Sequence, residues 1–307
     1  MKIAFCFPGQ GSQDVGMGRA IAEEFPAARA VYDEASEAVG FDVAKLCFEG
    51  SLEELTRTEL QQPALVATSI ACLRAVKTIG IEPDYVIGHS VGEYSALAAA
   101  DAIGAGDAVA LVRERGEAMA EAARATPGAM AAVLGLDDAV VEELCLSIDG
   151  VWPANYNCPG QVVVSGENAA VDRLIEEAAA RGARKTVKLR VSGAFHSPLV
   201  ARAAERLKPA LAKASWQNPS PPFMSTVTAK LEDAQRMAAL LVEQLTAPVK
   251  FTQAVRGLVK DGVGMFVEIG PNQVLTGLLK RCDRSLRTIS VSDPESLRKL
   301  REKLSAV

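Results

Sequence analysis

Tyr85-Val86-Ile87-Gly88-His89-Ser90-Val91-Gly92-Glu93-Tyr94 is the stretch from which the fold of this chain is best worked out. A short apolar run over Asp84 to Ile87 predicts a buried strand, and an alanine-rich helical pattern follows the glycines. Gly88 to Gly92 fits G-x-S-x-G, the pattern of a nucleophile elbow, which exposes a serine hydroxyl at the carboxyl end of a sheet. We therefore predict that Ser90 is a covalent nucleophile. The alternative is a glycine-rich turn with no chemistry.

Short apolar runs and helical patterns alternate on both sides of this stretch. Ile3 to Phe7 is predicted to be a strand and Pro63 to Ile79 a helix. Near the end of the chain a strand is expected over Met265 to Ile269, with a helix opened by Gly270-Pro271. This alternation predicts a doubly wound α/β core built on a parallel sheet.

The order of predicted elements changes in the middle of the chain. Strands and helices are expected there in the order β-α-β-β-α-β, over Ala129–Gly135, Asp137–Ile148, Trp152–Asn157, Gln161–Ser165, Asn168–Arg181 and Arg184–Val191. That order is typical of a ferredoxin-like unit. We expect residues 126–194 to form a small inserted domain, and residues 1–125 and 195–307 to form a larger, discontinuous one.

Composition narrows the class of protein. The chain has 307 residues, 49% of them hydrophobic, and a formal net charge of -5, which argues against nucleic-acid binding. It has no apolar run of about 18 residues, so no membrane span is expected. The start of the chain is predicted to be a strand that ends at Pro8-Gly9 rather than a signal peptide. The six cysteines are scattered without a CxxC pair, which indicates reduced, mostly buried thiols in the cytoplasm and no metal site.

A serine nucleophile needs a general base, usually histidine, and this chain has two histidines. His89 adjoins Ser90 on the elbow, where neighbouring side chains project in different directions. His196 is therefore the predicted base. It precedes a helix expected over Leu199 to Ala214, with Ser197 as the N-cap and a proline in the first turn. No aspartate or glutamate stands out as a third, orienting member.

One arginine lies on the apolar side of a predicted helix. The apolar stripe of that helix follows the spacing Ala108, Leu111, Val112, Arg115, Met119. A buried guanidinium needs an anionic partner, and its planar fork fits a carboxylate in a bidentate manner. Arg115 is thus predicted to bind a carboxylate of the substrate. The alternative is a structural ion pair with an internal aspartate or glutamate.

Seven segments of the chain match one known family in order. They are Phe7–Gln13, Gln62–Ala64, Gly88–Tyr94, Arg115-Gly116 with Met119, Asn157–Val162, Gly193–Ser197 and Glu268–Pro271. In these segments the chain resembles the malonyl-CoA:acyl carrier protein transacylases of bacterial fatty-acid synthesis. The resemblance implies a large α/β-hydrolase-like domain with a parallel sheet and a smaller ferredoxin-like domain. This agrees with the division drawn above.

The resemblance also implies roles for individual residues. The backbone amides of Gln10 and Val91 are expected to form an oxyanion hole, as two fixed donors suit an acyl-transfer intermediate. Arg115 is expected to hold the malonyl carboxylate. Without the resemblance, Gln10 would be an ordinary polar turn residue.

Four further residues follow from the resemblance. Gln62 and Asn157 are expected to line the site, and Phe195 fits the pattern of malonyl-selecting acyltransferases. In this family a main-chain carbonyl orients the imidazole, and the matching carbonyl is expected near Lys250. Several relatives carry glutamine or arginine there, so no role is assigned to its side chain.

The implied reaction is transfer of malonyl from malonyl-CoA to the phosphopantetheine thiol of holo acyl carrier protein by a cytoplasmic, monomeric enzyme. No cofactor is expected, because the coenzyme A thioester is a substrate. Two alternative functions are that of a serine esterase or thioesterase and that of a non-catalytic module that binds carrier protein. Basic side chains are expected either to dock the acidic carrier or to be ordinary solvated charges; they are Arg181, Arg184, Lys185, Lys188, Arg190, Lys280, Arg281, Arg284 and Arg287.

Overall fold

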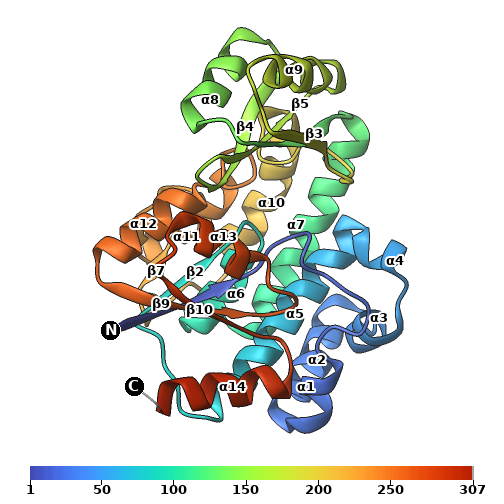
Figure 1. Cartoon of the computed structure of the whole chain (residues 1–307). Coiled ribbons are helices and arrows are strands. Elements are labelled where there is room, and N and C mark those ends of the chain that lie inside the picture. Colours follow the sequence, from blue (N-terminus) through green and yellow to red (C-terminus); the bar gives the residue numbers. More distant parts are fainter. Residues whose placement is uncertain (306–307) are drawn as a thin grey trace.

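The computed structural model describes residues 1–305, and its centre is a six-stranded, mostly parallel sheet (Figure 1). The strands run in the order β10-β9-β1-β2-β7-β8, and only β8 is antiparallel to its neighbour. Their bounds are β1 Lys2–Phe7, β2 Tyr85–Gly88, β7 Phe223–Met224, β8 Leu231–Glu232, β9 Val263–Ile269 and β10 Arg287–Val291. The predicted mixed α/β fold with a parallel sheet is confirmed.

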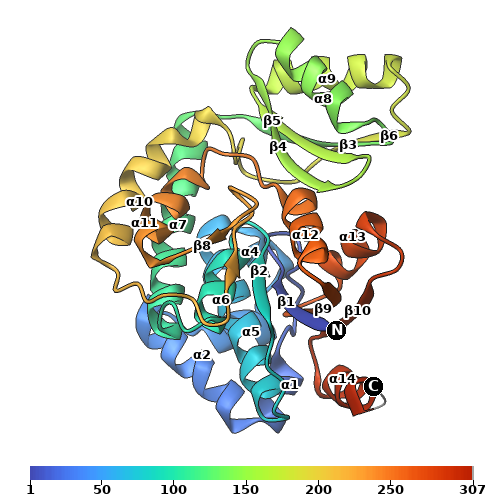
Figure 2. The same cartoon turned by 90° about the vertical axis from the view of Figure 1, so that its left-hand side faces the viewer.

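Helices cover both faces of this sheet, because both faces are apolar. In β1, Phe5 and Phe7 join one hydrophobic cluster, whereas Ala4 and Cys6 join another. Figure 2 shows α5 (Thr58–Lys77), α6 (Gly92–Ala99) and α7 (Ala105–Ala125) on one side of the sheet, with α12 (Phe251–Lys260) and α13 (Val274–Cys282) on the other. Such burial on both faces is typical of parallel sheets.

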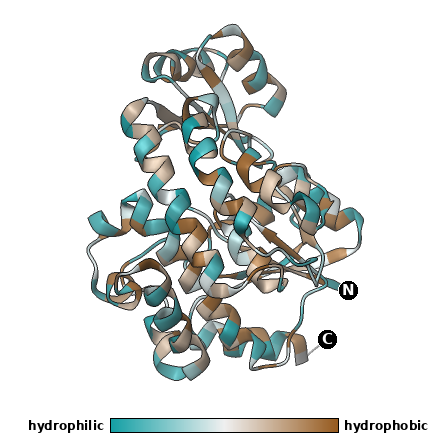
Figure 3. Ribbon diagram, turned by 180° about the vertical axis from the view of Figure 1, so that it is seen from behind, coloured by the Kyte–Doolittle hydropathy of each residue, from teal (hydrophilic) through white to brown (hydrophobic). Residues whose placement is uncertain are grey.

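The remaining helices surround this core. They are α1 Arg19–Glu24, α2 Pro26–Val39, α3 Val43–Glu49, α4 Leu52–Thr56, the 3₁₀ turn η1 Pro198–Val200, α10 Ala201–Lys213, α11 Ala234–Glu243 and α14 Pro294–Ser305. In Figure 3 the central strands are mostly brown, and the surrounding helices carry teal residues as well. No helix of residues 1–305 is long and apolar enough to cross a bilayer. Five of the six cysteines are buried and all six are free thiols, as the sequence predicted.

A second sheet, at the top of Figure 1, is antiparallel and runs in the order β4-β5-β3-β6. Its elements are β3 Ala129–Leu134, α8 Asp138–Ser147, β4 Val151–Cys158, β5 Gln161–Gly166, α9 Asn168–Ala180 and β6 Lys185–Lys188. It has a hydrophobic core of its own, which includes Val133, Val164 and Leu174. An isolated parallel bridge from Asn155 to Val249 joins it to the rest of the chain.

One predicted boundary is wrong in a way that matters for the site. The helix expected to begin at Pro63 begins at Thr58, so the proline lies inside α5. Proline cannot donate to the carbonyl four residues earlier. Arg113 Nη1 instead donates to that carbonyl, of Glu59, at 3.3 Å. The extended helix carries Gln62, which packs toward α7.

Three other elements also differ from expectation. β6 ends at Lys188, where its pairing with β3 ends. The helix predicted from Leu199 is divided into η1 and α10, although Ser197 does cap it, accepting from the Leu199 N–H at 3.3 Å. α13 begins at Val274 rather than at Gly270-Pro271, because the φ angles of Gly270 (138°) and Asn272 (63°) are positive and incompatible with a right-handed helix.

Candidate active site

The turn between β2 and α6 holds Ser90 in a strained conformation. Its φ is 52°, in the left-handed region that residues with a Cβ seldom adopt. The two flanking glycines allow the turn to be this tight. A Cβ at Gly88 would lie 2.2 Å from the Glu93 amide nitrogen, and one at Gly92 would lie 2.2 Å from the Phe7 carbonyl oxygen. The strand, sharp turn and helix predicted around Ser90 are therefore present.

The serine hydroxyl and the predicted base are within hydrogen-bonding distance. Ser90 Oγ is 2.8 Å from His196 Nε2. On the other side of the imidazole, Nδ1 faces two main-chain carbonyl oxygens, of Gln244 at 2.9 Å and of Ala247 at 3.2 Å. Because carbonyl oxygens only accept, Nδ1 carries the proton and Nε2 is left as the acceptor for the serine.

The environment keeps this imidazole neutral. His196 is 5% exposed. Burial, followed by the positive charge of Arg115, lowers its pKa from 6.5 to about 3. At neutral pH the ring therefore has a free lone pair at Nε2. It can accept a proton from Ser90 without first losing one.

The prediction for Lys250 is wrong. Its carbonyl accepts from the Ala254 N–H at 3.0 Å within the first turn of α12, and His196 Nδ1 instead faces the carbonyls of Gln244 and Ala247. The carbonyl that lies nearest Nδ1 belongs to Gln244, which follows the last residue of α11. The last carbonyls of a helix have no partner within the helix, whereas the first ones do. A search for predicted helix C-termini could have suggested this alternative.

Arg115 projects from α7 into the protein interior and is 1% exposed. Its Nη1 donates to Gln62 Oε1 at 2.8 Å. Its Nη2 donates to Gln244 Oε1 at 2.9 Å and to Ser90 Oγ at 3.2 Å. The guanidinium carbon also lies 6.0 Å from the centre of the Tyr94 ring.

No carboxylate of residues 1–305 lies within 4.0 Å of the Arg115 nitrogens, so the alternative of a direct structural ion pair is wrong. Its Nε is buried without a hydrogen-bond partner. Burial lowers the pKa of the guanidinium, although arginine remains charged in proteins. A buried cation held by neutral oxygens is suited to receiving an anion.

A cavity of about 90 Å³ opens beside the serine. Its lining contains Gln10, His89, Ser90, Met119, Met130, Asn155, Leu189, Val191, Phe195 and His196. Of the residues expected around the site, Gln10 and Phe195 line this cavity directly. Gln62 and Asn157 lie one step behind the lining: Gln62 Nε2 is 3.3 Å from Met119 Sδ, and Asn157 Oδ1 is 2.8 Å from His89 Nε2. Arg115 reaches the lining through its contact with Ser90.

The loop after β1 packs against the elbow, because β1 and β2 are adjacent parallel strands. A Cβ at Gly9 would lie 2.4 Å from the His89 carbonyl oxygen, which explains the glycine next to Gln10. Among the hydrogen bonds found within residues 1–305, none uses the amide N–H of Gln10 or of Val91. Both amides are therefore free to donate to a ligand.

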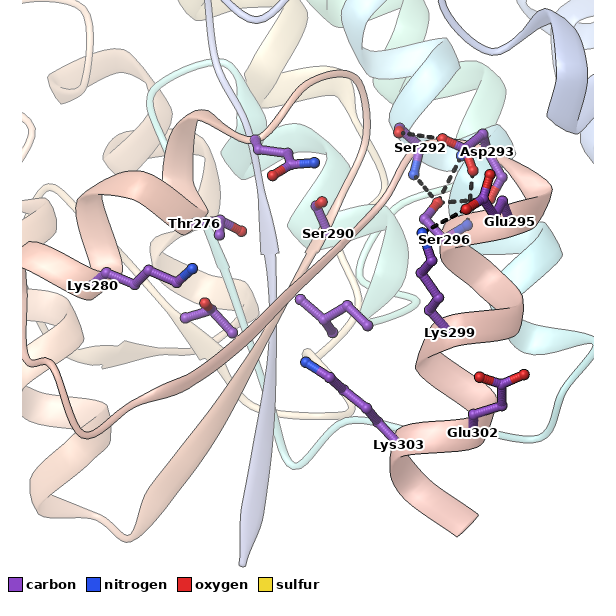
Figure 4. Close-up of a pocket in the computed structure, with 13 residues that line it drawn as sticks. Thr276, Lys280, Ser290, Ser292, Asp293, Glu295, Ser296, Lys299, Glu302 and Lys303 are labelled. Atoms are coloured by element: carbon purple, nitrogen blue, oxygen red, sulfur yellow. Dashed lines mark hydrogen bonds and ion pairs between the residues drawn. The ribbon is translucent and has the colours of Figure 1, made fainter. Parts of the chain in front are cut away.

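A larger hollow elsewhere contains no comparable chemistry. It has a volume of about 450 Å³ and lies between α13, β10 and α14 (Figure 4). Lys280 enters it from α13, and Lys299 and Lys303 enter from α14. Lys299 is paired with Glu295 at 2.6 Å. The hollow lacks a nucleophile held by a base, so the elbow is the candidate active site.

Comparison with known proteins gives consistent matches over nearly the whole chain. Residues 4–300 match the model of a family described as the acyl transferase domain. The malonyl CoA-acyl carrier protein transacylase of Bacillus subtilis strain 168 is 48% identical over 305 residues, which is 96% of this chain and 95% of that protein.

Solved structures agree in fold. The malonyl-CoA:acyl carrier protein transacylase from Xanthomonas oryzae is 44% identical, with a TM-score of 0.94 and coverage of 98% of each chain. A malonyl-transacylase solved in complex with its type II PKS acyl-carrier protein is 39% identical, with a TM-score of 0.95 over 99% of this chain and 100% of that one.

Proposed function

The chain belongs to the acyl transferase domain family, and on this basis we propose that it transfers malonyl from malonyl-CoA to the phosphopantetheine thiol of holo acyl carrier protein, supplying extender units for fatty-acid synthesis. One observation carries the proposal: the Ser90 hydroxyl lies between a neutral imidazole and a buried guanidinium that has no carboxylate partner. The imidazole supplies the base for acyl transfer, and the guanidinium selects an acyl group that ends in a carboxylate.

In the first half-reaction, Ser90 Oγ attacks the thioester carbonyl carbon of malonyl-CoA while His196 Nε2 takes the hydroxyl proton. The amides of Gln10 and Val91 hold the oxyanion, and Val91 lies at the start of α6, where the helix dipole favours negative charge. The carbon–sulfur bond then breaks, His196 returns the proton to the coenzyme A sulfur, and malonyl remains on Ser90 as an ester.

In the second half-reaction, the carrier thiol gives its proton to His196 and attacks the same carbonyl carbon. The ester bond breaks, and the proton passes back to Ser90 Oγ. Arg115 holds the distal carboxylate through both steps, which fixes the orientation of the ester and limits its hydrolysis. Only groups of the protein are used, and coenzyme A thioester is a substrate rather than a cofactor.

We propose further that the chain is divided as its sequence suggested. Residues 1–125 and 195–307 would form an α/β-hydrolase-like domain, because the strands of the large sheet come from these two segments. Residues 126–194 would form a ferredoxin-like domain, which the element order and the strand order β4-β5-β3-β6 support. Since Ser90, His196 and Arg115 come from one chain, a monomer is sufficient for the reaction, which we place in the cytoplasm.

The two rival functions predict different products. A serine esterase or thioesterase would release coenzyme A without accumulating an ester, and has no use for the Arg115 cation. A non-catalytic module would neither form an adduct nor release coenzyme A. Mass spectrometry of the intact chain after mixing with malonyl-CoA separates these three possibilities.

We expect an added mass of one malonyl group on Ser90, which disappears when holo acyl carrier protein is added and reappears on the carrier. Ser90→Ala is the control and should show no adduct. Arg115→Ala should retain the nucleophile and base but label poorly. Free coenzyme A without an adduct would support a hydrolase, and neither product would support a binding module.

A further inference from the structure

A buried glutamate on α6 has both carboxylate oxygens facing donors. Glu93 is fully buried. Its Oε1 accepts from the Thr226 amide at 2.6 Å and from the Thr226 hydroxyl at 2.8 Å. The hydroxyl of Ser225 lies at 3.4 Å from the same oxygen. Its Oε2 accepts from Gln244 Nε2 at 2.5 Å. These donors need a side chain with an acceptor oxygen at both positions. An ionised carboxylate has two such oxygens, whereas a neutral amide has one.

The carboxylate fixes the direction of the Gln244 side chain. An amide has one donor end and one acceptor end. Because Glu93 can only accept, it takes the Nε2 end, and Gln244 Oε1 is directed to Arg115 Nη2 at 2.9 Å. A reversed amide would place its NH₂ group against the guanidinium, donor against donor. The Arg115 guanidinium and the Glu93 carboxylate therefore determine the orientation of the Gln244 amide together.

Gln244 also touches the nucleophile and the base. Its Nε2 donates to the Ser90 carbonyl at 3.0 Å, and its own carbonyl lies 2.9 Å from His196 Nδ1. A residue that is fully buried and held at its side-chain end cannot shift its backbone freely. A fixed Gln244 amide therefore keeps the Arg115 guanidinium, the His196 imidazole and the Ser90 backbone in place.

We propose that Glu93 is a positioning residue that acts through the Gln244 amide, keeping Arg115 directed at the acyl group while leaving the guanidinium open to a carboxylate. This proposal rests on the function proposed above. The Glu93 charge balances the buried Arg115 charge across one amide. A carboxylate in direct contact would occupy the fork and compete with the substrate, whereas an amide oxygen is a weaker acceptor that malonyl can displace.

Glu93→Gln tests this, with Glu268→Gln as the matched control. Glu268 is also fully buried, and its two oxygens accept from the amides of Leu275 at 2.9 Å and Thr276 at 2.7 Å, on the far face of the sheet from Arg115. Both variants lose one buried carboxylate and should lose stability. Only a change at Glu93 should alter which acyl donor is preferred.

The measurement is the ratio of kcat/KM for malonyl-CoA to that for acetyl-CoA, which does not depend on the fraction of active protein. For Glu93→Gln we expect the ratio to fall by roughly tenfold, as is typical when one hydrogen bond to a charged group is lost. For Glu268→Gln the ratio should equal that of the wild type. An unchanged ratio in Glu93→Gln, or an equal fall in both variants, overturns the proposal.

A double exchange, Glu93→Gln with Gln244→Glu, keeps the test decisive if the single variant does not fold. The amide introduced at position 93 can accept from Thr226 and donate to the carboxylate introduced at position 244, which then contacts Arg115 directly and no longer donates to the Ser90 carbonyl. We expect a folded protein in which malonyl no longer has an advantage over acetyl, because the guanidinium is already neutralised. A retained malonyl preference overturns the proposal. If wild-type protein forms no malonyl ester, the proposed function fails instead.

Discussion

Arg115 donates a hydrogen bond from Nη2 to Ser90 Oγ at 3.2 Å, although Arg115 lies in α7 and Ser90, 25 positions earlier, lies in the turn between β2 and α6. The cation is therefore in contact with the nucleophile before any substrate is present. A three-carbon diacid attached to Ser90 would bring its free carboxylate back to a group already beside the ester. The contact therefore suits an acyl group as short as malonyl.

Replacing Arg115 by alanine should abolish the preference for malonyl over acetyl donors. The lost contact is a buried, charge-assisted hydrogen bond to a carboxylate, worth about 3 kcal/mol, or roughly a hundredfold in kcat/KM for malonyl-CoA. Acetyl transfer should change much less. The comparison is the same kcat/KM ratio, measured for the wild type and the variant.

Arg115→Lys is the informative control for this prediction. Lysine keeps the charge but cannot form a bidentate fork, so the ratio should recover in part. An Arg115→Ala variant that still prefers malonyl-CoA by the wild-type factor would contradict the role assigned to the guanidinium.

His196 should be neutral in the folded protein at pH 6, and His89 should become protonated only at a lower pH than a free imidazole. Burial lowers the pKa of His89, and burial together with the Arg115 charge lowers that of His196 to about 3. Nitrogen chemical shifts of the imidazoles report the protonation state directly, and two histidines are easily assigned with His89→Gln. Arg115→Ala removes one of the causes and should raise the His196 pKa. An imidazolium signal from His196 at pH 6 would sink this prediction.

The lowered pKa values of the two histidines also make the free energy of unfolding depend on pH. In the unfolded chain both imidazoles titrate near 6.5, whereas in the folded chain they stay neutral to lower pH. Below pH 6.5 the unfolded state therefore binds more protons at these two groups, and their contribution to the free energy of unfolding should fall as the pH is lowered from 6.5. Glu93, whose pKa is raised by burial to about 6, contributes in the opposite direction, so the comparison with a histidine variant isolates the imidazole contribution. Urea unfolding should be measured for the wild type and for His89→Gln between pH 5 and 7. The free energy of unfolding should depend less steeply on pH in the variant.

Gly92 should not tolerate a methyl group. A Cβ there would lie 2.2 Å from the Phe7 carbonyl oxygen and 2.7 Å from that of Pro8, and both atoms belong to the backbone. Gly92→Ala should therefore lower the melting temperature and abolish labelling of Ser90, by separating β1 from the elbow. Gly277→Ala is the matched control, since a Cβ there meets nothing within 4 Å inside α13. Helix propensity predicts that this control is more stable by up to about 1 kcal/mol.

The sequence was informative where the chemistry depends on local pattern. The elbow around Ser90 follows from glycine spacing and a preceding strand, and Arg115 follows from helical phase. His196 followed from the scarcity of histidine. The elbow and the phase of the Arg115 helix can each be recognised within about a dozen residues. The assignment of His196 needs only the number of histidines in the sequence.

The contacts that the sequence could not supply join distant segments through unremarkable residues. Gln244 is one of many polar side chains in the chain, and only a predicted helix C-terminus could have distinguished its carbonyl from that of Lys250. Glu93 follows the elbow and looks like an ordinary helix N-terminal acid, which is favourable there even when exposed. Their importance comes from burial and from the meeting of α6, α7 and the end of α11, which only the folded chain defines.

The basic C-terminal end of α13 provides a test of where the carrier protein docks. Arg281 Nη1 bonds Gln161 Oε1 at 2.6 Å, so this end lies against the second sheet. Arg284 is exposed and forms no ion pair within residues 1–305, whereas Arg181 is already paired with Glu143 at 3.2 Å. Arg284 thus has a charge free to attract an acidic partner.

Arg284→Glu should raise the KM for holo acyl carrier protein by roughly three- to tenfold and weaken its dependence on salt, because a charge at the rim of an interface acts mainly on the rate of encounter. The KM for malonyl-CoA in the ester-forming half-reaction, measured without carrier, should not change. Arg181→Glu should have a smaller effect, since its charge is already neutralised by Glu143. Equal KM values for the carrier in all three proteins would mean that these arginines are ordinary solvated charges and that docking uses another surface.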